Sequence, residues 1–298
     1  MALHRLTTLS LGVPDPVATA AFYRDFGLSE TAPGVLATRE GGDQLRLSAA
    51  PKRRLIALGL GVEHPDDLER AERGVRAIGF EPRREGGRLV VHDPGSDVAL
   101  ELSVAPAIAP APPARARLNS PGQALRRNAR ADAFSRNDPV RPRRLGHVVF
   151  TSLDFASSRR LFVDGLGFRV SDELPGIGAF LRCSTDHHNV FLQEAPIRFL
   201  HHAAWEVDDA DEIGRGGKAM VDADPSRHVW GFGRHYVGSN YFWYLRDPAG
   251  NYAEYYSDLD YVDDDAAWNP GKVEGMLGLY AWGPPVPPEF IAPPDLLG

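Results

Sequence analysis

Residues 145–164, with the sequence LGHVVFTSLDFASSRRLFVD, begin as an apolar run and continue as a segment of helical character. We expect a strand at 145–152, because a short apolar run bounded by turn residues is typical of a buried strand. Asp154 then stands where an N-cap residue would begin a helix. The same order of features occurs at residues 6–25, LTTLSLGVPDPVATAAFYRD, with Asp15 as the expected N-cap. The chain therefore contains an internal repeat.

The repeat extends beyond these two segments. Residues 5–13 alternate apolar and polar side chains, as a half-buried strand does. Apolar strands are predicted at 54–62 and 199–207, followed by helices at 65–78 and 209–221 and then by short strands. Each half of the chain thus consists of two successive β-α-β-β-β units. Repetition at this scale predicts an α+β fold with two domains and four units in all.

The composition is that of an ordinary globular protein, with 43% hydrophobic and 24% charged residues among 298. A formal net charge of −7 argues against nucleic acid as the main partner. No apolar run approaches the ~20 residues that a membrane-spanning helix needs, and the first residues do not resemble a signal peptide. The single cysteine, Cys183, cannot form an internal disulfide. We expect a cytoplasmic protein with no membrane or nucleic-acid partner.

Two segments lie outside the repeated units. Residues 105–142 are rich in Pro, Ala and Arg and are predicted to be a linker, with a short helix expected within 122–135. Residues 259–298 form a Pro-rich carboxy-terminal tail, which could cover a site in the second half or pack against a neighbouring subunit. The predicted domains are 1–104 and 143–258.

Two histidines of the second half stand in apolar strands, His147 in HVVF and His202 in HAAW. Each alone would more often be a hydrogen-bonded core residue. Glu254 lies in an aromatic strand, where a carboxylate without a partner would be costly to bury. The three occupy equivalent places in the repeated units, so their side chains can converge. Two histidines and one carboxylate that leave coordination positions open are the set expected for non-haem Fe(II).

The first half of the chain provides an internal control. Aligning the repeats puts Thr8 in the place of His147 and Ala57 in the place of His202. Glu101 follows a turn as its counterpart in the second half does, but without histidines it cannot hold a metal well. The amino-terminal domain is therefore predicted to be structural and without a metal site.

Residues 235–254 carry a pattern of fixed spacing, His-x8-Tyr-x2-Asp-Pro-x-Gly-x3-Glu. Its central Asp-Pro-x-Gly-Asn supplies a turn between two strands. The pattern resembles the signature of the type I extradiol ring-cleaving dioxygenases of the vicinal oxygen chelate superfamily. The resemblance implies that each domain curls into a funnel-like half-barrel, and that the amino-terminal domain corresponds to the inactive first domain of the two-domain enzymes.

The resemblance also implies roles for the histidines. The metal, Fe(II) or Mn(II), would be held by His147, His202 and Glu254. Of the adjacent His201 and His202, His202 is preferred as the ligand. In the family, the second histidine of this pair, directly before the apolar run, is the one retained. Adjacent strand residues point to opposite faces, so His201 is expected to pack on the outer face.

A further histidine and a tyrosine would complete the site. By resemblance, His188 is the acid–base catalyst, with the adjacent His187 as a rival, and His235 and Tyr244 line the substrate pocket. Other residues could contribute walls or meet a substrate carboxylate, although core packing or surface roles explain them equally well or better. These are Trp230, Phe232, Phe242, Arg246 and His228.

The resemblance implies an enzyme of aromatic-compound degradation, expected to be a homo-oligomer. It would cleave a catechol next to its vicinal hydroxyls with O₂, giving a 2-hydroxymuconic semialdehyde-type product. Two alternatives share the fold, namely a glyoxalase-like metal-dependent lyase or isomerase and a non-catalytic small-molecule-binding protein. The complete set of His147, His202 and Glu254 argues against the non-catalytic alternative.

Overall fold

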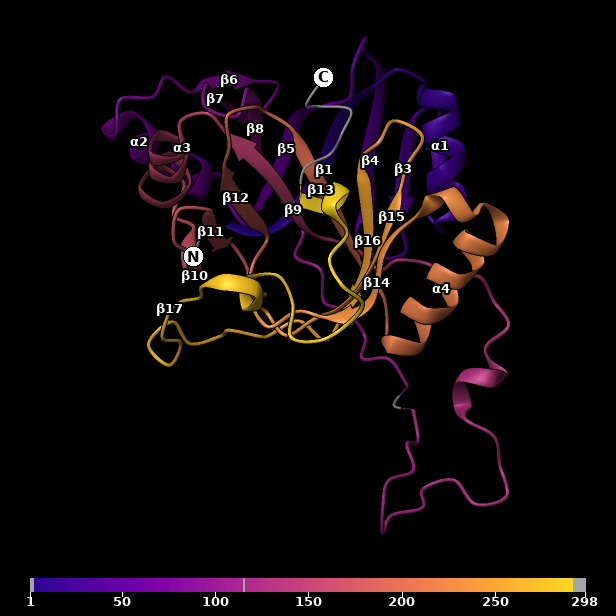
Figure 1. The fold of residues 1–298 in the computed structure, drawn as a ribbon. Coiled ribbons are helices and arrows are strands. Elements are labelled where there is room, and N and C mark those ends of the chain that lie inside the picture. Colours follow the sequence, from indigo (N-terminus) through magenta and orange to yellow (C-terminus); the bar gives the residue numbers. More distant parts are fainter. Residues whose placement is uncertain (1–2, 115, 292–298) are drawn as a thin grey trace.

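The computed structural model describes residues 3–114 and 116–291. Its first half contains two β-α-β-β-β units (Figure 1). The first unit comprises β1 (Leu3–Val13), α1 (Pro16–Asp25), β2 (Ser29–Ala32), β3 (Val35–Thr38) and β4 (Gly42–Ala49). The second comprises β5 (Arg54–Val62), α2 (Pro65–Ala77), β6 (Arg83–Glu85), β7 (Arg88–Asp93) and β8 (Val98–Val104).

The second half repeats this order. Its first unit comprises β9 (Leu145–Ser152), α3 (Phe155–Arg160), β10 (Arg169–Leu174), β11 (Gly178–Arg182) and β12 (Val190–Glu194). The second comprises β13 (Leu200–Glu206), α4 (Ala210–Ala223), β14 (His228–Arg234), β15 (Tyr241–Arg246) and β16 (Tyr252–Ser257). The tail adds β17 (Gly271–Lys272) and α5 (Pro288–Ile291). The predicted α+β arrangement of repeated units is confirmed.

Each half forms one sheet, and the two sheets have the same strand order. The first runs β6-β7-β8-β5-β1-β4-β3-β2, and the second runs β14-β15-β16-β13-β9-β12-β11-β10, with β17 added at its edge. In both sheets the two central strands pair antiparallel, and each also pairs parallel with an outer strand of its own unit. The first strands of both units therefore lie side by side at the centre of each sheet.

The strand register confirms the alignment of the two halves. The paired residues are Thr8, Gly59 and Glu101 across the first sheet, and His147, Ala204 and Glu254 across the second. Ala57 lies two residues before Gly59, as His202 lies two before Ala204. In the first half Arg88 contacts Glu101 at 2.6 Å, so an arginine compensates the charge of this carboxylate.

The two halves pack closely through helices and rings. At the end of α1, Phe26 stacks on Tyr255 of β16 with ring centroids 3.8 Å apart, and the Tyr255 hydroxyl donates to the Phe26 carbonyl at 2.7 Å. In α2, Gly74 lies against Gly165, where an added Cβ would stand 2.5 Å from the Gly165 carbonyl oxygen. Figure 1 shows the resulting pairs, α2 beside α3 and α1 above α4. Both sheets contribute to one continuous core.

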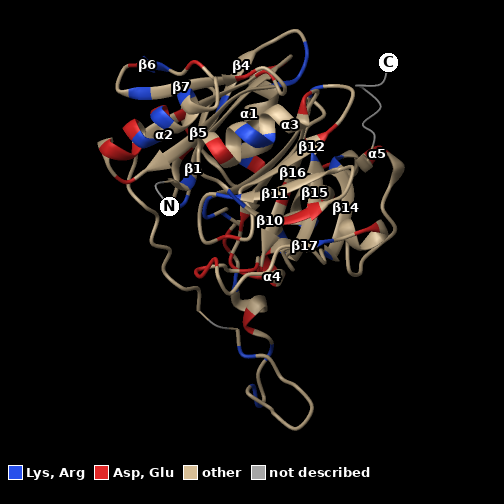
Figure 2. Cartoon of the chain, turned by 90° about the vertical axis from the view of Figure 1, so that its left-hand side faces the viewer, with Lys and Arg blue, Asp and Glu red and all other residues tan. Residues whose placement is uncertain are grey.

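Most of the described part of residues 105–142 extends away from the body of the protein, and Figure 2 marks several basic residues along it. The short helix expected within 122–135 was wrong, apart from a 3₁₀ turn at Asp132–Ser135. Phe134 is 76% exposed, so the 3₁₀ turn does not pack against the core. A helix within residues 122–135 would be short, and a short helix is marginal without such packing. No helix among the described residues is long and apolar enough to cross a membrane.

Candidate active site

Three side chains from adjacent strands of the second sheet converge in its interior. Nε2 of His147 (β9) and Nε2 of His202 (β13) lie 3.2 and 3.3 Å from Oε2 of Glu254 (β16). All three residues are buried, and one donor atom of each lies within 4.8 Å of the others. Donors about 2.1 Å from one ion, at roughly 90–110° to each other, would be about 3.0–3.4 Å apart. These spacings fit a shared divalent metal ion.

The protonation states also suit a cation. Burial alone would raise the pKa of Glu254, but the neighbouring imidazole of His147 holds this pKa well below its usual range. Burial lowers the pKa of His202. Asn240 donates to the other carboxylate oxygen, Oε1, at 3.1 Å. The carboxylate is therefore anionic and the His202 imidazole neutral, which are the forms that bind metals.

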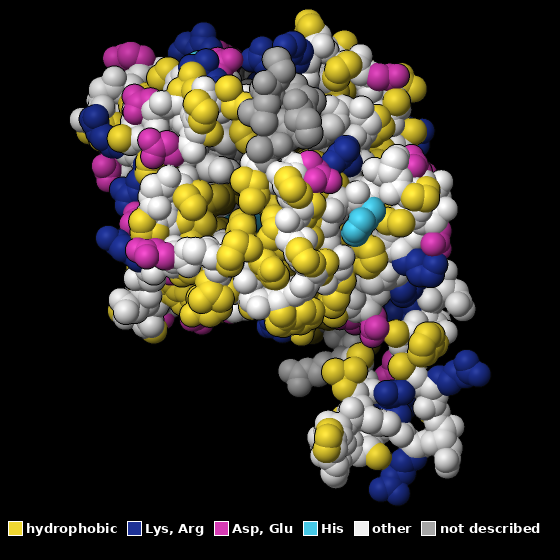
Figure 3. Space-filling view, in the orientation of Figure 1, with side chains coloured by type: hydrophobic (Ala, Val, Ile, Leu, Met, Phe, Trp, Pro, Cys, Tyr) yellow, Lys and Arg dark blue, Asp and Glu magenta, His cyan; other side chains and the backbone are white. Residues whose placement is uncertain are grey.

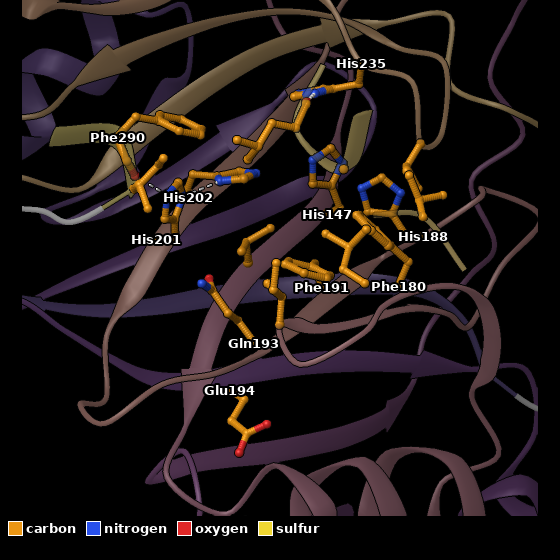
Figure 4. Close-up of a pocket in the computed structure, with 18 of the residues that line it drawn as sticks. His147, Phe180, His188, Phe191, Gln193, Glu194, His201, His202, His235 and Phe290 are labelled. Atoms are coloured by element: carbon orange, nitrogen blue, oxygen red, sulfur yellow. Dashed lines mark hydrogen bonds between the residues drawn. The ribbon is translucent and has the colours of Figure 1, made fainter. Parts of the chain in front are cut away.

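His201 does not pack on the outer face, so that expectation was wrong. Its Nδ1 lies 2.8 Å from Nδ1 of His202, and its Nε2 lies 2.7 Å from the Phe290 carbonyl oxygen (Figure 4). The pairing of β13 with β9 shifts register between Leu200 and His202. Because this bulge interrupts the alternation of side chains, both imidazoles turn to the same side.

These contacts fix the tautomer of His202. A carbonyl oxygen only accepts, so Nε2 of His201 carries the proton and its Nδ1 accepts from Nδ1 of His202. Nε2 of His202 therefore keeps its lone pair and faces Glu254. This is the arrangement in which an outer hydrogen-bond partner orients a metal-binding imidazole.

We expect His201→Phe to weaken metal binding by about 10–100-fold, because the phenyl ring fills the space without fixing the tautomer of His202. Metal affinity would be measured by competition with a chelator. His228→Phe is the matched control, since His228 contacts Trp243 outside the cavity. Equal metal affinities in the two variants would contradict the orienting role of His201.

His188 lies beside the triad, with its ring centroid 4.3 Å from that of His147. Burial lowers the pKa of His188 well below its usual value, so the imidazole is neutral. His187 contacts Nδ1 of His188 at 3.0 Å and Oδ2 of Asp172 at 2.9 Å through its own Nδ1 and Nε2. The Asp172 carboxylate accepts a hydrogen bond from Nε2 of His187, so Nδ1 of His187 accepts one from Nδ1 of His188. Nε2 of His188 is therefore unprotonated. Of the two rivals, His188 lines the cavity and His187 supports it from behind.

His235 and Tyr244 form the other side of the site. Nε2 of His235 lies 2.9 Å from the Tyr244 hydroxyl and 4.0 Å from Oε1 of Glu254. Its Nδ1 donates to the Leu279 carbonyl in the tail. Burial lowers the pKa of His235 to about 4 and raises that of the Tyr244 phenol well above its usual value. Both groups are neutral near pH 7, and the Tyr244 hydroxyl donates a hydrogen bond to Nε2 of His235.

The remaining candidates lie outside the cavity. Trp230 and Phe242 pack behind Tyr244 in a separate apolar cluster. Phe232 stacks on Tyr241. Arg246 lies over the ring of Tyr252 and His228 contacts Trp243, so neither faces the site. For these residues the packing and surface interpretations were the right ones.

The tail, as far as residue 291, covers the site, which was one of the two alternatives for residues 259–298. Four of its backbone carbonyls accept hydrogen bonds from side chains of the second domain. The pairs are Leu279 with His235, Pro284 with Trp230, Glu289 with Tyr252 and Phe290 with His201. Together with the histidines, the tail lines a cavity of about 470 Å³ that opens to the surface. Sequence reasoning left the covering of the site by the tail as one of two alternatives, and it missed the role of Asn240. The adjacent pairs His187–His188 and His201–His202 were the only signal for the outer imidazoles.

Two proteins of known activity are similar to this chain in sequence. Metapyrocatechase 2 of Cupriavidus necator is 32% identical over 97% of this chain and 92% of its own length. The iron-dependent extradiol dioxygenase of Rhodococcus jostii (strain RHA1) is 28% identical over 41% of this chain and 45% of its own.

Two solved structures have the same fold across 97% of this chain. The Mn(II)-bound glyoxalase from Novosphingobium aromaticivorans has a TM-score of 0.76 at 24% identity, with 94% of its chain covered. Homoprotocatechuate 2,3-dioxygenase from Arthrobacter globiformis has a TM-score of 0.75 at 20% identity, with 91% covered. Residues 144–255, which contain the triad, match the Glyoxalase/Bleomycin resistance protein/Dioxygenase superfamily. The chain therefore belongs to this superfamily and, within it, to the extradiol ring-cleaving dioxygenases.

Proposed function

We propose that this enzyme opens the ring of a catechol next to its two vicinal hydroxyls, using O₂ and one Fe(II) ion. The ion would be held by His147, His202 and Glu254, and the product would be of the 2-hydroxymuconic semialdehyde type. The observation that carries the proposal is the convergence of the two imidazoles and the carboxylate at 3.2–3.3 Å, beside a cavity that both imidazoles line.

The donor set suits a metal that must accept further ligands. Within residues 3–114 and 116–291, no further histidine, cysteine or acidic residue joins the group. Two imidazoles and one carboxylate leave coordination positions open for substrate and O₂. When bound, such an ion lowers the pKa of the catechol hydroxyls and mediates electron transfer from the ring to O₂. Mn(II) fits the same donors, and the relatives include both an iron-dependent and a manganese-dependent dioxygenase.

His188 is proposed to move protons. Its Nε2 is the unprotonated nitrogen, and its ring stands beside His147 at the edge of the triad. It can therefore take a proton from a catechol hydroxyl at Nε2 and return that proton later in the cycle. Its Nδ1 stays bonded to His187, so the ring keeps one orientation while Nε2 gains and loses the proton.

His235 and Tyr244 are proposed to orient the substrate. Their polar atoms lie 2.9 Å apart and both residues line the cavity. The Tyr244 hydroxyl can turn from His235 to donate to a substrate oxygen on which negative charge develops. The tail residues whose carbonyls hold His235 and His201 also line the cavity, where they would reduce the access of water to the reacting groups.

The lyase or isomerase alternative would need a further glutamate as ligand and base. Among the described residues that line the cavity, the other glutamates are Glu194 and Glu274, and both are exposed. They lie outside the group formed by His147, His202 and Glu254. The site geometry therefore favours ring opening.

Oxygen uptake tests the proposal. Enzyme loaded anaerobically with Fe(II), and a parallel sample loaded with Mn(II), would be mixed with catechol, 3-methylcatechol or 2,3-dihydroxybiphenyl in air. We expect one O₂ consumed per catechol and a yellow product. Stoichiometric metal without oxygen uptake on all three compounds would contradict ring cleavage. The homo-oligomeric state stays a prediction, which light scattering on the eluted protein would check.

A further inference from the structure

The cavity continues beyond the histidines along an apolar wall. This wall consists of Val149, Leu174, Phe180, Phe191 and Val237, which form a cluster of their own apart from the main core. All five line the cavity. Phe180 and Phe191 stack with centroids 4.3 Å apart, and Phe180 meets the ring of His188 edge-on at 5.0 Å. The wall therefore begins at the proposed acid–base residue and leads away from the metal triad.

The tail completes this outer part of the cavity. Val273, Leu279, Phe290 and Ile291 face it from the carboxy-terminal segment. Figure 3 shows hydrophobic side chains gathered around a hollow on this face of the molecule. The surface around the outer cavity is thus apolar on both sides, which suits an apolar ligand group.

The volume exceeds what a bare catechol needs. A cavity of about 150 Å³ accommodates benzene, whereas this cavity measures about 470 Å³. A catechol held at the triad would leave most of the space along the apolar wall empty. A substituent as large as a second ring or a short alkyl chain would fill it.

The charges lining the outer cavity disfavour an anionic substituent. None of the described residues that line the cavity is a lysine or an arginine. Gln193 and Glu194 lie at the end away from the histidines (Figure 4), and Glu274 also lines the cavity. A substrate carboxylate here would lose water without gaining a cation and would face two glutamates.

We propose that the preferred substrates are catechols with a large, uncharged, apolar substituent, and that catechols with a carboxylate substituent are poor substrates. This inference rests on the proposed ring-cleaving function. The substituent would lie against Phe180 and Phe191, on the side of the ring next to His188. The apolar cluster would thus determine specificity, while the triad and its neighbours perform the chemistry.

A matched substrate pair tests the inference directly. The compounds 3,4-dihydroxyphenylacetate and its methyl ester differ mainly in charge. We expect kcat/KM for the ester to exceed that for the acid by at least about 30-fold, since the unpaired carboxylate must be desolvated. Across 4-alkylcatechols, kcat/KM should rise about fourfold per buried methylene until the cavity is filled. Equal kcat/KM for acid and ester would overturn the proposal.

A cation placed in the cavity should relax this selectivity. Gln193→Arg puts a guanidinium at the outer wall, and Gln123→Arg, in the exposed linker, is the matched control. The first variant should raise kcat/KM for the acid by about tenfold or more, and the second should not change it. Ile177→Lys places a cation at a second lining position. An acid-to-ester ratio unchanged in both lining variants would contradict charge exclusion.

A binding measurement needs no turnover, so it separates failure of the ring-opening proposal from failure of the proposed preference for apolar substituents. Calorimetry would compare biphenyl with 4-biphenylcarboxylate on the metal-loaded enzyme. Binding of biphenyl at least about 30-fold tighter would support the apolar site even if no catechol were opened. Equal or tighter binding of the carboxylate would overturn the inference even if catechol were opened.

Discussion

Glu254→Gln is expected to abolish both metal binding and ring opening. The amide keeps the size of the side chain but loses the negative charge that the two imidazoles face at 3.2 and 3.3 Å. The amide offers only its neutral carbonyl oxygen, which is a weaker donor, and a buried site without an anionic ligand holds a divalent ion weakly. The loss of affinity should exceed the roughly 10–100-fold caused by losing an outer hydrogen-bond partner. Metal content after dialysis and oxygen uptake with catechol would be measured.

The first half offers a matched control for this variant. Glu101 occupies the equivalent position in the strand register, and it pairs with Arg88 in place of two histidines. Glu101→Gln should leave metal content and activity unchanged and should alter stability by no more than about 1 kcal/mol, as is typical of exposed ion pairs. Stoichiometric metal in Glu254→Gln, or metal loss in Glu101→Gln, would show that the metal site has been placed in the wrong group of residues.

His188→Phe is expected to keep the metal and to lower kcat by about 10²–10⁴-fold, the range typical of losing a general acid or base. The phenyl ring fits this position, because the imidazole already packs edge-on against Phe180. Since none of the three proposed ligands is altered, metal content should stay stoichiometric. The effect should fall mainly on kcat and much less on KM, because the substrate is anchored at the ion.

His187, the alternative candidate for the acid–base catalyst, provides the comparison. His187→Phe removes the partner of His188 and leaves Asp172 without its imidazole, so a smaller loss of about 10–100-fold is expected. Thermal unfolding of both variants would show whether the fold is intact. A larger fall in kcat for His187→Phe than for His188→Phe, in folded protein, would exchange the two assignments.

The amino-acid sequence by itself determined the repeat and the residues that converge. The four units could be predicted because apolar periodicity and N-cap residues such as Asp15 and Asp154 act locally, and both caps are observed. The group of His147, His202 and Glu254 could be predicted because the first strands of the two units pair at the centre of the sheet and the last strand pairs with one of them. Their role as metal ligands, and that of His188 as acid–base catalyst, stay predictions.

The tertiary structure alone decided which way His201 points, where the tail lies and how large the cavity is. His201 turns toward His202 because of a bulge in the pairing of two strands that are far apart in sequence, and local alternation of side chains cannot reveal such a bulge. The tail covers the site through backbone carbonyls, which every residue carries, so no side-chain pattern marks those positions. Both features depend on contacts between distant segments, and such contacts exist only once the chain has folded.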